Sequence, residues 1–122
     1  MAWRFKSNLP LSTQIVERLR GDIISGAYEI GSPFPTVRSL AEEAAVNPNT
    51  MQKALCMLEE EGLLICQSTS GRTVTNDPAI IERAREHTAE MSIKALIADA
   101  KRIGIPRDLL IKKIEEDWYD GE

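Results

Sequence analysis

At 122 residues, with 43% hydrophobic and 28% charged residues, the chain has the composition of a globular protein with one domain, or one domain and an appendage. Its net charge of −4 excludes the strongly basic character that is usual in nucleic-acid binders, and no apolar run approaches the roughly 20 residues of a membrane span. The first residues lack the apolar core of a signal peptide, so we expect a cytoplasmic protein with no membrane partner.

The first 34 residues predict an aromatic arm, one scaffold helix and a connector. Apolar side chains of residues 9–25 recur on one helical face, and Gly26 follows as a helix stop. Before this helix, Trp3 and Phe5 alternate with basic residues. The alternation fits two roles, a nucleic-acid-binding arm or an arm whose rings pack on the domain or on a dimer partner. Residues 28–34 predict a connector with one short strand.

The next segment, from residue 36 to residue 62, predicts two short helices joined by a tight turn. Thr36 is the expected N-cap of the first helix, which runs to about residue 44. Asn47 is the expected N-cap of the second helix, and Pro48 suits its first turn because no backbone N–H is needed there. The outward side chains of the second helix suit base edges and phosphates in a DNA major groove. These side chains are Asn49, Thr50, Gln52 and Lys53.

A hairpin follows the helix pair at once. Residues 63–67 and 72–75 have strand composition, and residues 68–71 form a small polar turn between them. Two helices followed by a hairpin is the order of a winged helix-turn-helix. The predicted fold class is therefore mainly α with a small β wing.

The C-terminal segment predicts two helices that expose more apolar surface than they can bury against each other. Asp77 and Pro78 mark the start of a helix that runs to about residue 103, and Pro106 begins a final helix. We therefore expect domains at residues 1–76 and 77–122, the second serving to form a homodimer. The alternative is that these helices pack back on the winged domain. The expected dimerisation residues are Ile81, Ala84, Thr88, Met91, Ala95, Leu96, Leu110 and Ile114.

Residues with catalytic or metal-binding chemistry are few and scattered. His87 stands alone among charged residues of a predicted helix, and Cys56 and Cys66 lack the spacing of a zinc site. We expect no enzyme activity, no metal and no cofactor. The cysteines are expected to be reduced thiols, with a redox switch between them as the alternative.

Several motifs resemble one bacterial family. The run from Leu9 to Val74 looks like the N-terminal domain of GntR-type transcription regulators, most specifically around residues 35–41, 49–55 and 58–63. The Asn-Pro-Asn-Thr sequence at residues 47–50 and the short C-terminal tail resemble the YtrA subgroup of that family.

This resemblance implies a dimeric, sequence-specific DNA-binding repressor that acts on an operator with dyad symmetry. It implies major-groove entry by residues 47–61 and contact of the wing, residues 68–72, with the DNA backbone or minor groove. Pro48 and Gln52 stand where many relatives have arginine, which implies a different operator sequence. The expected DNA-binding residues are Thr36, Arg38, Asn47, Pro48, Asn49, Thr50, Gln52, Lys53, Ser70, Gly71 and Arg72.

The resemblance also implies a target among transporter operons, because YtrA-like members often lie beside them; the sequence identifies no small-molecule effector. The acidic balance favours a second reading, a winged-helix module that binds proteins rather than DNA. Residues 1–77 contain seven Lys and Arg against nine Asp and Glu, so any cations at the DNA must act by their placement.

Overall fold

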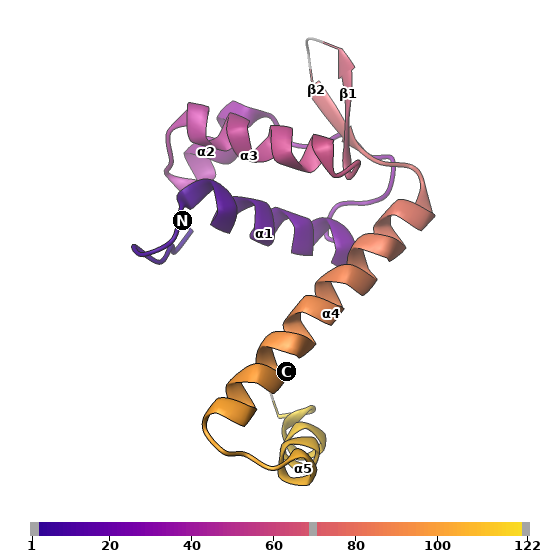
Figure 1. The fold of residues 1–122 in the computed structure, drawn as a ribbon. Helices are drawn as coiled ribbons and strands as arrows, with labels where there is room; N and C mark the ends of the chain where they lie inside the picture. Colours follow the sequence, from indigo (N-terminus) through magenta and orange to yellow (C-terminus); the bar gives the residue numbers. More distant parts are fainter. Residues whose placement is uncertain (1–2, 69–70, 121–122) are drawn as a thin grey trace. The chain divides into compact units, whose positions relative to one another are not determined.

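The computed structural model describes residues 3–68 and 71–120, which form five helices and one two-stranded sheet (Figure 1). The predicted class, mainly α with a small β wing, is confirmed. In chain order the elements are α1 (Leu11–Ser25), α2 (Val37–Ala44), α3 (Pro48–Glu60), β1 (Leu64–Ser68), β2 (Gly71–Val74), α4 (Pro78–Arg102) and α5 (Arg107–Asp117).

The chain divides into two compact units after Arg85. The domain boundary predicted between residues 76 and 77 falls just before α4 begins. The first unit extends past this point because Ile80, Ile81 and Ala84 on the first turns of α4 pack against its core. α4 therefore starts in the first unit and ends in the second.

α1 is the scaffold of the first unit because one of its faces is apolar throughout. Ile15, Leu19 and Ile23 have at most 1% of their surface exposed. Burying each such side chain stabilises the fold by roughly 1.5–3 kcal/mol. α1 packs chiefly against α3, which runs beside it in Figure 1. Gly26 ends α1 with a φ of 90°, a left-handed conformation that glycine adopts at little cost.

The turn between α2 and α3 is fixed by local capping. The Thr36 hydroxyl accepts a hydrogen bond from Ser39 N at 3.1 Å and so caps α2. Ala45 closes α2 in the left-handed region, with φ of 59°, which costs a non-glycine residue about 1 kcal/mol. The Asn47 side chain then accepts from Asn49 N at 2.7 Å and caps α3. Both predicted caps are present.

The wing is a two-stranded antiparallel hairpin joined to the connector. β1 and β2 pair in register from Leu64 with Val74 to Cys66 with Arg72, and a bulge follows. The predicted strand of the connector is a single bridge between Pro33 and Thr73. The wing is thereby attached to the chain just before α2, which puts the hairpin at the C-terminal end of α3 (Figure 1).

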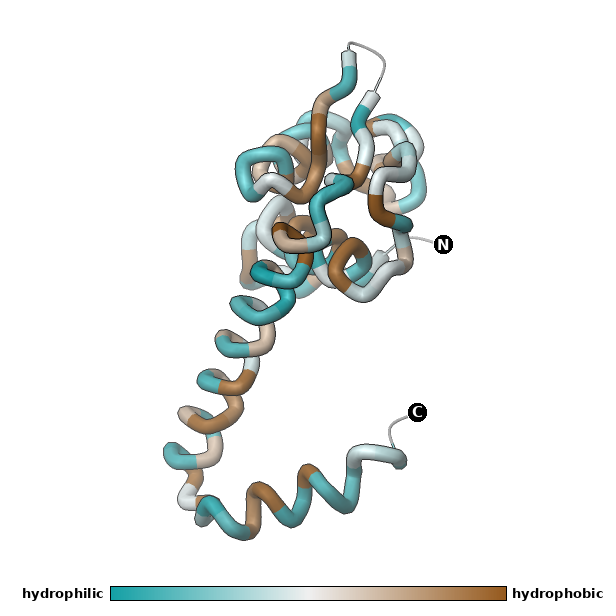
Figure 2. The backbone as a smooth tube through the Cα atoms, turned by 90° about the vertical axis from the view of Figure 1, so that its right-hand side faces the viewer, coloured by the Kyte–Doolittle hydropathy of each residue, from teal (hydrophilic) through white to brown (hydrophobic). Residues whose placement is uncertain are grey.

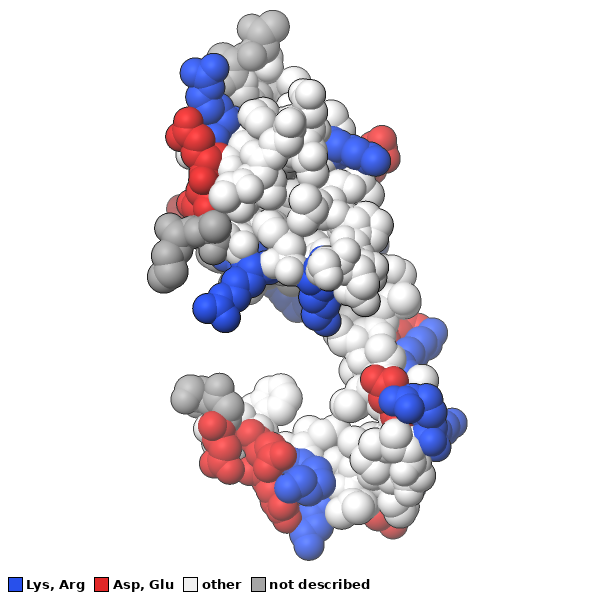
Figure 3. Space-filling model, turned by 90° about the vertical axis from the view of Figure 1, so that its left-hand side faces the viewer, with Lys and Arg blue, Asp and Glu red and all other residues white. Residues whose placement is uncertain are grey.

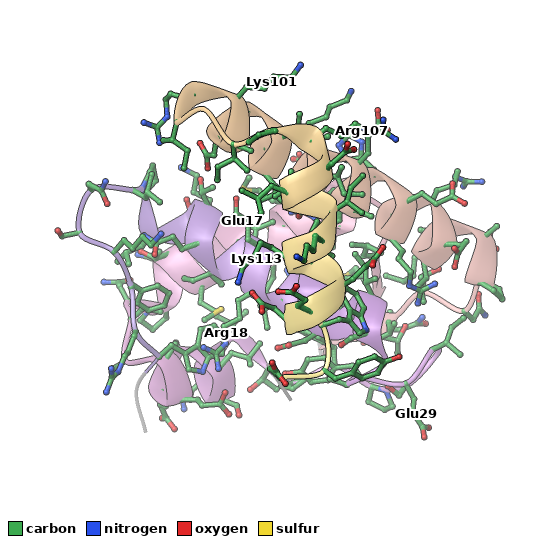
Figure 4. The ribbon with its side chains drawn as sticks, turned by 90° about the horizontal axis from the view of Figure 1, so that it is seen from below. Glu17, Arg18, Glu29, Lys101, Arg107 and Lys113 are labelled. Atoms are coloured by element: carbon green, nitrogen blue, oxygen red, sulfur yellow. The ribbon has the colours of Figure 1, made fainter. Side chains whose placement is uncertain are left out.

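The second unit consists of the later turns of α4 together with α5, and it exposes much apolar surface. Hydrophobic residues recur along both helices in Figure 2. Met91 and Ile93 are more than half exposed, and Trp118 is 68% exposed, whereas Ala100 is buried. Lys101 of α4 and Arg107 and Lys113 of α5, labelled in Figure 4, are exposed basic residues. Within the described residues no helix is long and apolar enough to cross a membrane.

Candidate nucleic-acid interface

The first turns of α3 present a polar surface to solvent. Asn49, Gln52 and Lys53 are exposed, whereas the nearby residues Met51 and Ala54 are fully buried. The alternation follows from the helical period, which turns the polar residues away from α1. The arrangement leaves two amides and one ammonium group available to a ligand that approaches the N-terminal half of α3.

Three other residues expected at this surface have structural roles or lower exposure. The side-chain oxygen of Asn47 caps α3, so it is already engaged. Pro48 is exposed at the first position of the helix, and Thr50 is half-buried. Their contribution to a ligand surface is therefore mainly one of shape.

The start of α2 adds one cation beside this surface. Arg38 is exposed and forms no ion pair with any residue that the structure describes, and the same holds for Lys53. The Thr36 hydroxyl is engaged in capping. Arg38 and Lys53, two of the cations expected at DNA, thus have no ion-pair partner among the described residues.

Arg72, the wing residue expected at DNA, is engaged within the first unit. Its side chain is only 14% exposed and forms an ion pair through Nε with Glu59 of α3. Its Nη2 also lies 3.9 Å from Cys56 Sγ. Gly71 is half-buried at the start of β2, and the predicted contact at Ser70 lies outside the described residues. Arg72 therefore faces α3 rather than solvent.

Sequence reasoning missed Glu59 and Cys56 as partners of Arg72. A charge signal was present, since three glutamates end α3 shortly before a hairpin with one arginine. The strand register decides which of them that arginine meets, and the register depends on the bulge after Cys66.

Ion pairs neutralise much of the acidic end of α3. Glu59 pairs with Arg72, and Glu61 accepts two hydrogen bonds from Arg20 of α1, at 2.6 and 2.8 Å. The hydrogen bond with Glu61 raises the pKa of Arg20. Figure 3 shows no continuous basic patch on the face that it displays, and several of its Lys and Arg groups lie against Asp or Glu. The two ion pairs therefore leave the acidic end of α3 with less uncompensated charge than its sequence suggests.

The aromatic arm packs on the first unit. Trp3 is 9% exposed, and its Nε1 donates to Glu43 Oε2 at 3.0 Å. The Arg18 guanidinium, labelled in Figure 4, lies 4.2 Å from the centre of the Trp3 ring. Of the two roles left open by the sequence, the structure favours packing over a free nucleic-acid-binding arm.

The expected dimerisation residues divide between the two units. Ile81 and Ala84 pack on the core of the first unit. Thr88 and Leu110 are half-buried, and the rest are exposed. A groove of about 910 Å³ runs between α4 and α5 within the second unit. Its apolar lining consists of Ile93, Leu96, Ile97, Ala100, Ile105, Leu110, Ile111, Ile114 and Trp118.

The cysteines and the histidine lie apart from any cluster of ligands. Cys56 is a half-buried free thiol, and Cys66 is an exposed free thiol that donates to the carbonyl oxygen of Ser68 at 3.4 Å. His87 is exposed. The described part of the chain brings no three His, Cys, Asp or Glu side chains together as a metal site.

Comparison with known proteins gives a consistent result. Residues 11–74 match the family described as bacterial regulatory proteins, gntR family. The chain is 29% identical over 121 residues to the HTH-type transcriptional repressor YtrA of Bacillus subtilis, covering 96% of this chain and 93% of that protein. The members of this family, including the Bacillus subtilis protein, are transcription regulators and not enzymes.

Solved structures agree with this match. A GntR family transcriptional regulator from Listeria monocytogenes superposes with a TM-score of 0.86 and 29% identity, over 92% of this chain and 98% of that one. YtrA from Sulfolobus acidocaldarius superposes with a TM-score of 0.56 and 26% identity, over 75% and 92% of the two chains. The chain therefore belongs to the GntR family of bacterial transcription regulators, and its first unit is a DNA-binding winged helix-turn-helix.

Proposed function

We propose that the protein is a homodimeric, sequence-specific repressor that binds an operator with dyad symmetry through the N-terminal half of α3. The observation that carries this proposal is the exposed polar surface of α3, where Asn49, Gln52 and Lys53 lie on the side turned away from the buried apolar face. Side-chain amides read base edges in the major groove, while cations hold phosphates. Arg38 is suited to the latter role, since it is exposed and unpaired among the described residues.

Dimer formation is supported by the second unit taken by itself. Its groove between α4 and α5 is lined by apolar side chains, many of which a monomer would leave exposed to water. An apolar surface of this kind is typical of an interface between proteins. A second copy offers the same surface, so a two-fold contact would cover both at once. Two winged domains related by a two-fold axis would require half-sites about one helical turn apart, roughly 10 base pairs centre to centre.

Repression is the inferred outcome because the Bacillus subtilis relative is named a repressor. We further infer that the target is the protein's own operon or a transporter operon, as the resemblance to the YtrA subgroup implies. A role at chromosomal DNA would place the protein in the cytoplasm.

A gel-shift titration tests the proposal directly. Duplexes from the region upstream of the protein's own gene are compared with a scrambled duplex of equal length, at low and moderate salt. Retention of the upstream duplex alone at moderate salt supports the proposal. Equal retention of both duplexes, or of neither, would favour the alternative of a winged-helix module that binds proteins.

A further inference from the structure

Arg72 connects the wing to the recognition helix α3. It stands on β2 opposite Cys66, and its guanidinium reaches Glu59 and Cys56, which lie three residues apart on α3. The Arg72 side chain is 14% exposed and that of Glu59 is 29% exposed. Two of the guanidinium nitrogens, Nε and Nη2, are thus engaged with side chains of α3.

We propose that Arg72 is a positioning residue, which holds the wing against α3 through Glu59, and that it makes no phosphate contact. The inference rests on the proposed function, because it concerns how the DNA-binding surface is assembled. It replaces the role in DNA contact that the sequence implied for Arg72.

The wing needs such an attachment because it is a hairpin of two short strands. An isolated two-stranded ribbon is marginal in water. At its base, Phe34 N donates to the Arg72 carbonyl oxygen at 2.8 Å and Val74 N donates to the Ser32 carbonyl oxygen at 2.9 Å. Beyond the base, a hollow of about 330 Å³ separates wing residues from Gln52 of α3. Arg72 lines this hollow and also touches α3, so its side chain sets the spacing between wing and helix.

The electrostatics argue against a phosphate contact by the same side chain. If Arg72 turned from Glu59 to a phosphate, the partly buried carboxylate of Glu59 would lose its partner. Such a loss destabilises a protein even where the ion pair itself contributes little stability. A paired arginine and glutamate also carry no net charge, so they add nothing to the attraction of DNA phosphates. Arg38 and Lys53 differ in both respects, since each is exposed and unpaired among the described residues.

The dependence of binding on salt separates the two roles. Loss of one phosphate contact reduces the slope of log K against log salt by about 0.9. Arg72→Ala should weaken operator binding about tenfold and leave this slope as in the wild type. Arg38→Ala, the control for a true phosphate contact, should reduce the slope by about 1 for each subunit. A reduced slope for Arg72→Ala, equal to that of Arg38→Ala, would overturn the proposal.

Charge exchange gives a second, independent readout. The double variant Glu59→Arg with Arg72→Glu keeps the net charge and can restore the pair, so its affinity should return to within about threefold of the wild type. If Arg72 contacts phosphate, the same variant places a carboxylate at DNA and binds worse than Arg72→Ala. Circular dichroism checks that each variant folds, and if the exchanged variant does not, the salt slope of Arg72→Ala decides alone.

Neighbouring glutamates supply a matched pair of controls. Glu60 is exposed and adjacent to Glu59, so Glu59→Gln and Glu60→Gln remove the same charge. We expect Glu59→Gln to weaken operator binding and Glu60→Gln to tighten it slightly. Equal tightening by both would show that Glu59 only competes with DNA for Arg72 and would overturn the proposal. Failure of the wild type to bind its operator would refute the proposed function instead, so the two failures are distinct.

Discussion

Replacing Gln52 by alanine tests whether α3 reads the operator. Gln52 is exposed, and its Nε2 donates to Cys56 Sγ at 3.5 Å, a weak acceptor one turn further along the helix. The amide can therefore turn toward a base with little loss inside the protein. Alanine favours helix, so the variant should keep its stability within about 0.5 kcal/mol of the wild type.

The expected loss of affinity follows from the chemistry of the amide. A glutamine that pairs with both adenine N6 and N7 contributes about 1–3 kcal/mol of discrimination. A dimer carries the residue twice, and distant sites add, so Gln52→Ala should cost about 2–6 kcal/mol on the operator. The lower limit corresponds to roughly a 30-fold weaker complex.

Fluorescence anisotropy with labelled duplexes measures this loss. The titration uses the operator, a scrambled duplex and a set of operators with single base-pair changes. Gln52→Ala should lose affinity for the operator only and should relax the preference at one position in each half-site. Lys53→Ala is the matched control, since Lys53 is the next residue and is also exposed. It should weaken operator and scrambled duplex alike and reduce the salt slope by about 1 per lost contact.

One outcome would refute this reasoning about α3. If Gln52→Ala binds every duplex as the wild type does while Arg38→Ala changes the preferred bases, then α2 rather than α3 reads the operator. The assignment of Arg38 to phosphate would fail in the same experiment.

The remaining predictions concern assembly, thiols and pH. Leu96→Asp with Ile114→Asp, which charges the apolar groove, should give a folded monomer at micromolar concentration by sedimentation and weak operator binding; a dimer would exclude this surface. Cys56→Ser with Cys66→Ser should fold and bind normally, because a hydroxyl keeps the polar contacts of each thiol; oxidant-dependent binding that needs both thiols would restore the redox switch. Burial, and after it the charges of nearby acids, raise the pKa of Tyr28. The folded state therefore favours the neutral phenol. The stability that this contributes is fully present below the unfolded pKa of about 10 and is lost as pH rises through the folded pKa. Tyr28→Phe should remove this loss in alkaline unfolding titrations.

The helix pair could be predicted because its signals are local. The N-cap role of Thr36, and of Asn47 with Pro48 after it, depends on neighbours within a few residues, and each cap is present in the structure. The buried stripe of α3 follows from the helical period alone. Such features need no knowledge of distant parts of the chain.

The partners of Arg72 could not be predicted for the opposite reason. Its ion pair with Glu59 joins residues that the hairpin brings together, and a bulge after Cys66 sets which side chains face α3. The extent of the first unit has a similar cause. Ile81 fits the heptad-like spacing of a dimer seam, but in the structure it packs against the core of the first unit. Periodicity identifies an apolar face without identifying what covers it.

Pairing of charges also explains how an acidic regulator can bind DNA. Arg20 forms an ion pair with Glu61, and Arg72 forms one with Glu59. These pairs neutralise two carboxylates at the C-terminal end of α3. The N-terminal half of α3 has no acidic residue, and it retains Lys53 with Arg38 nearby. Few free cations mean few released counterions, hence weak attraction to DNA of arbitrary sequence. If α3 reads the operator as proposed, base contacts then supply most of the preference for the operator over DNA of other sequence.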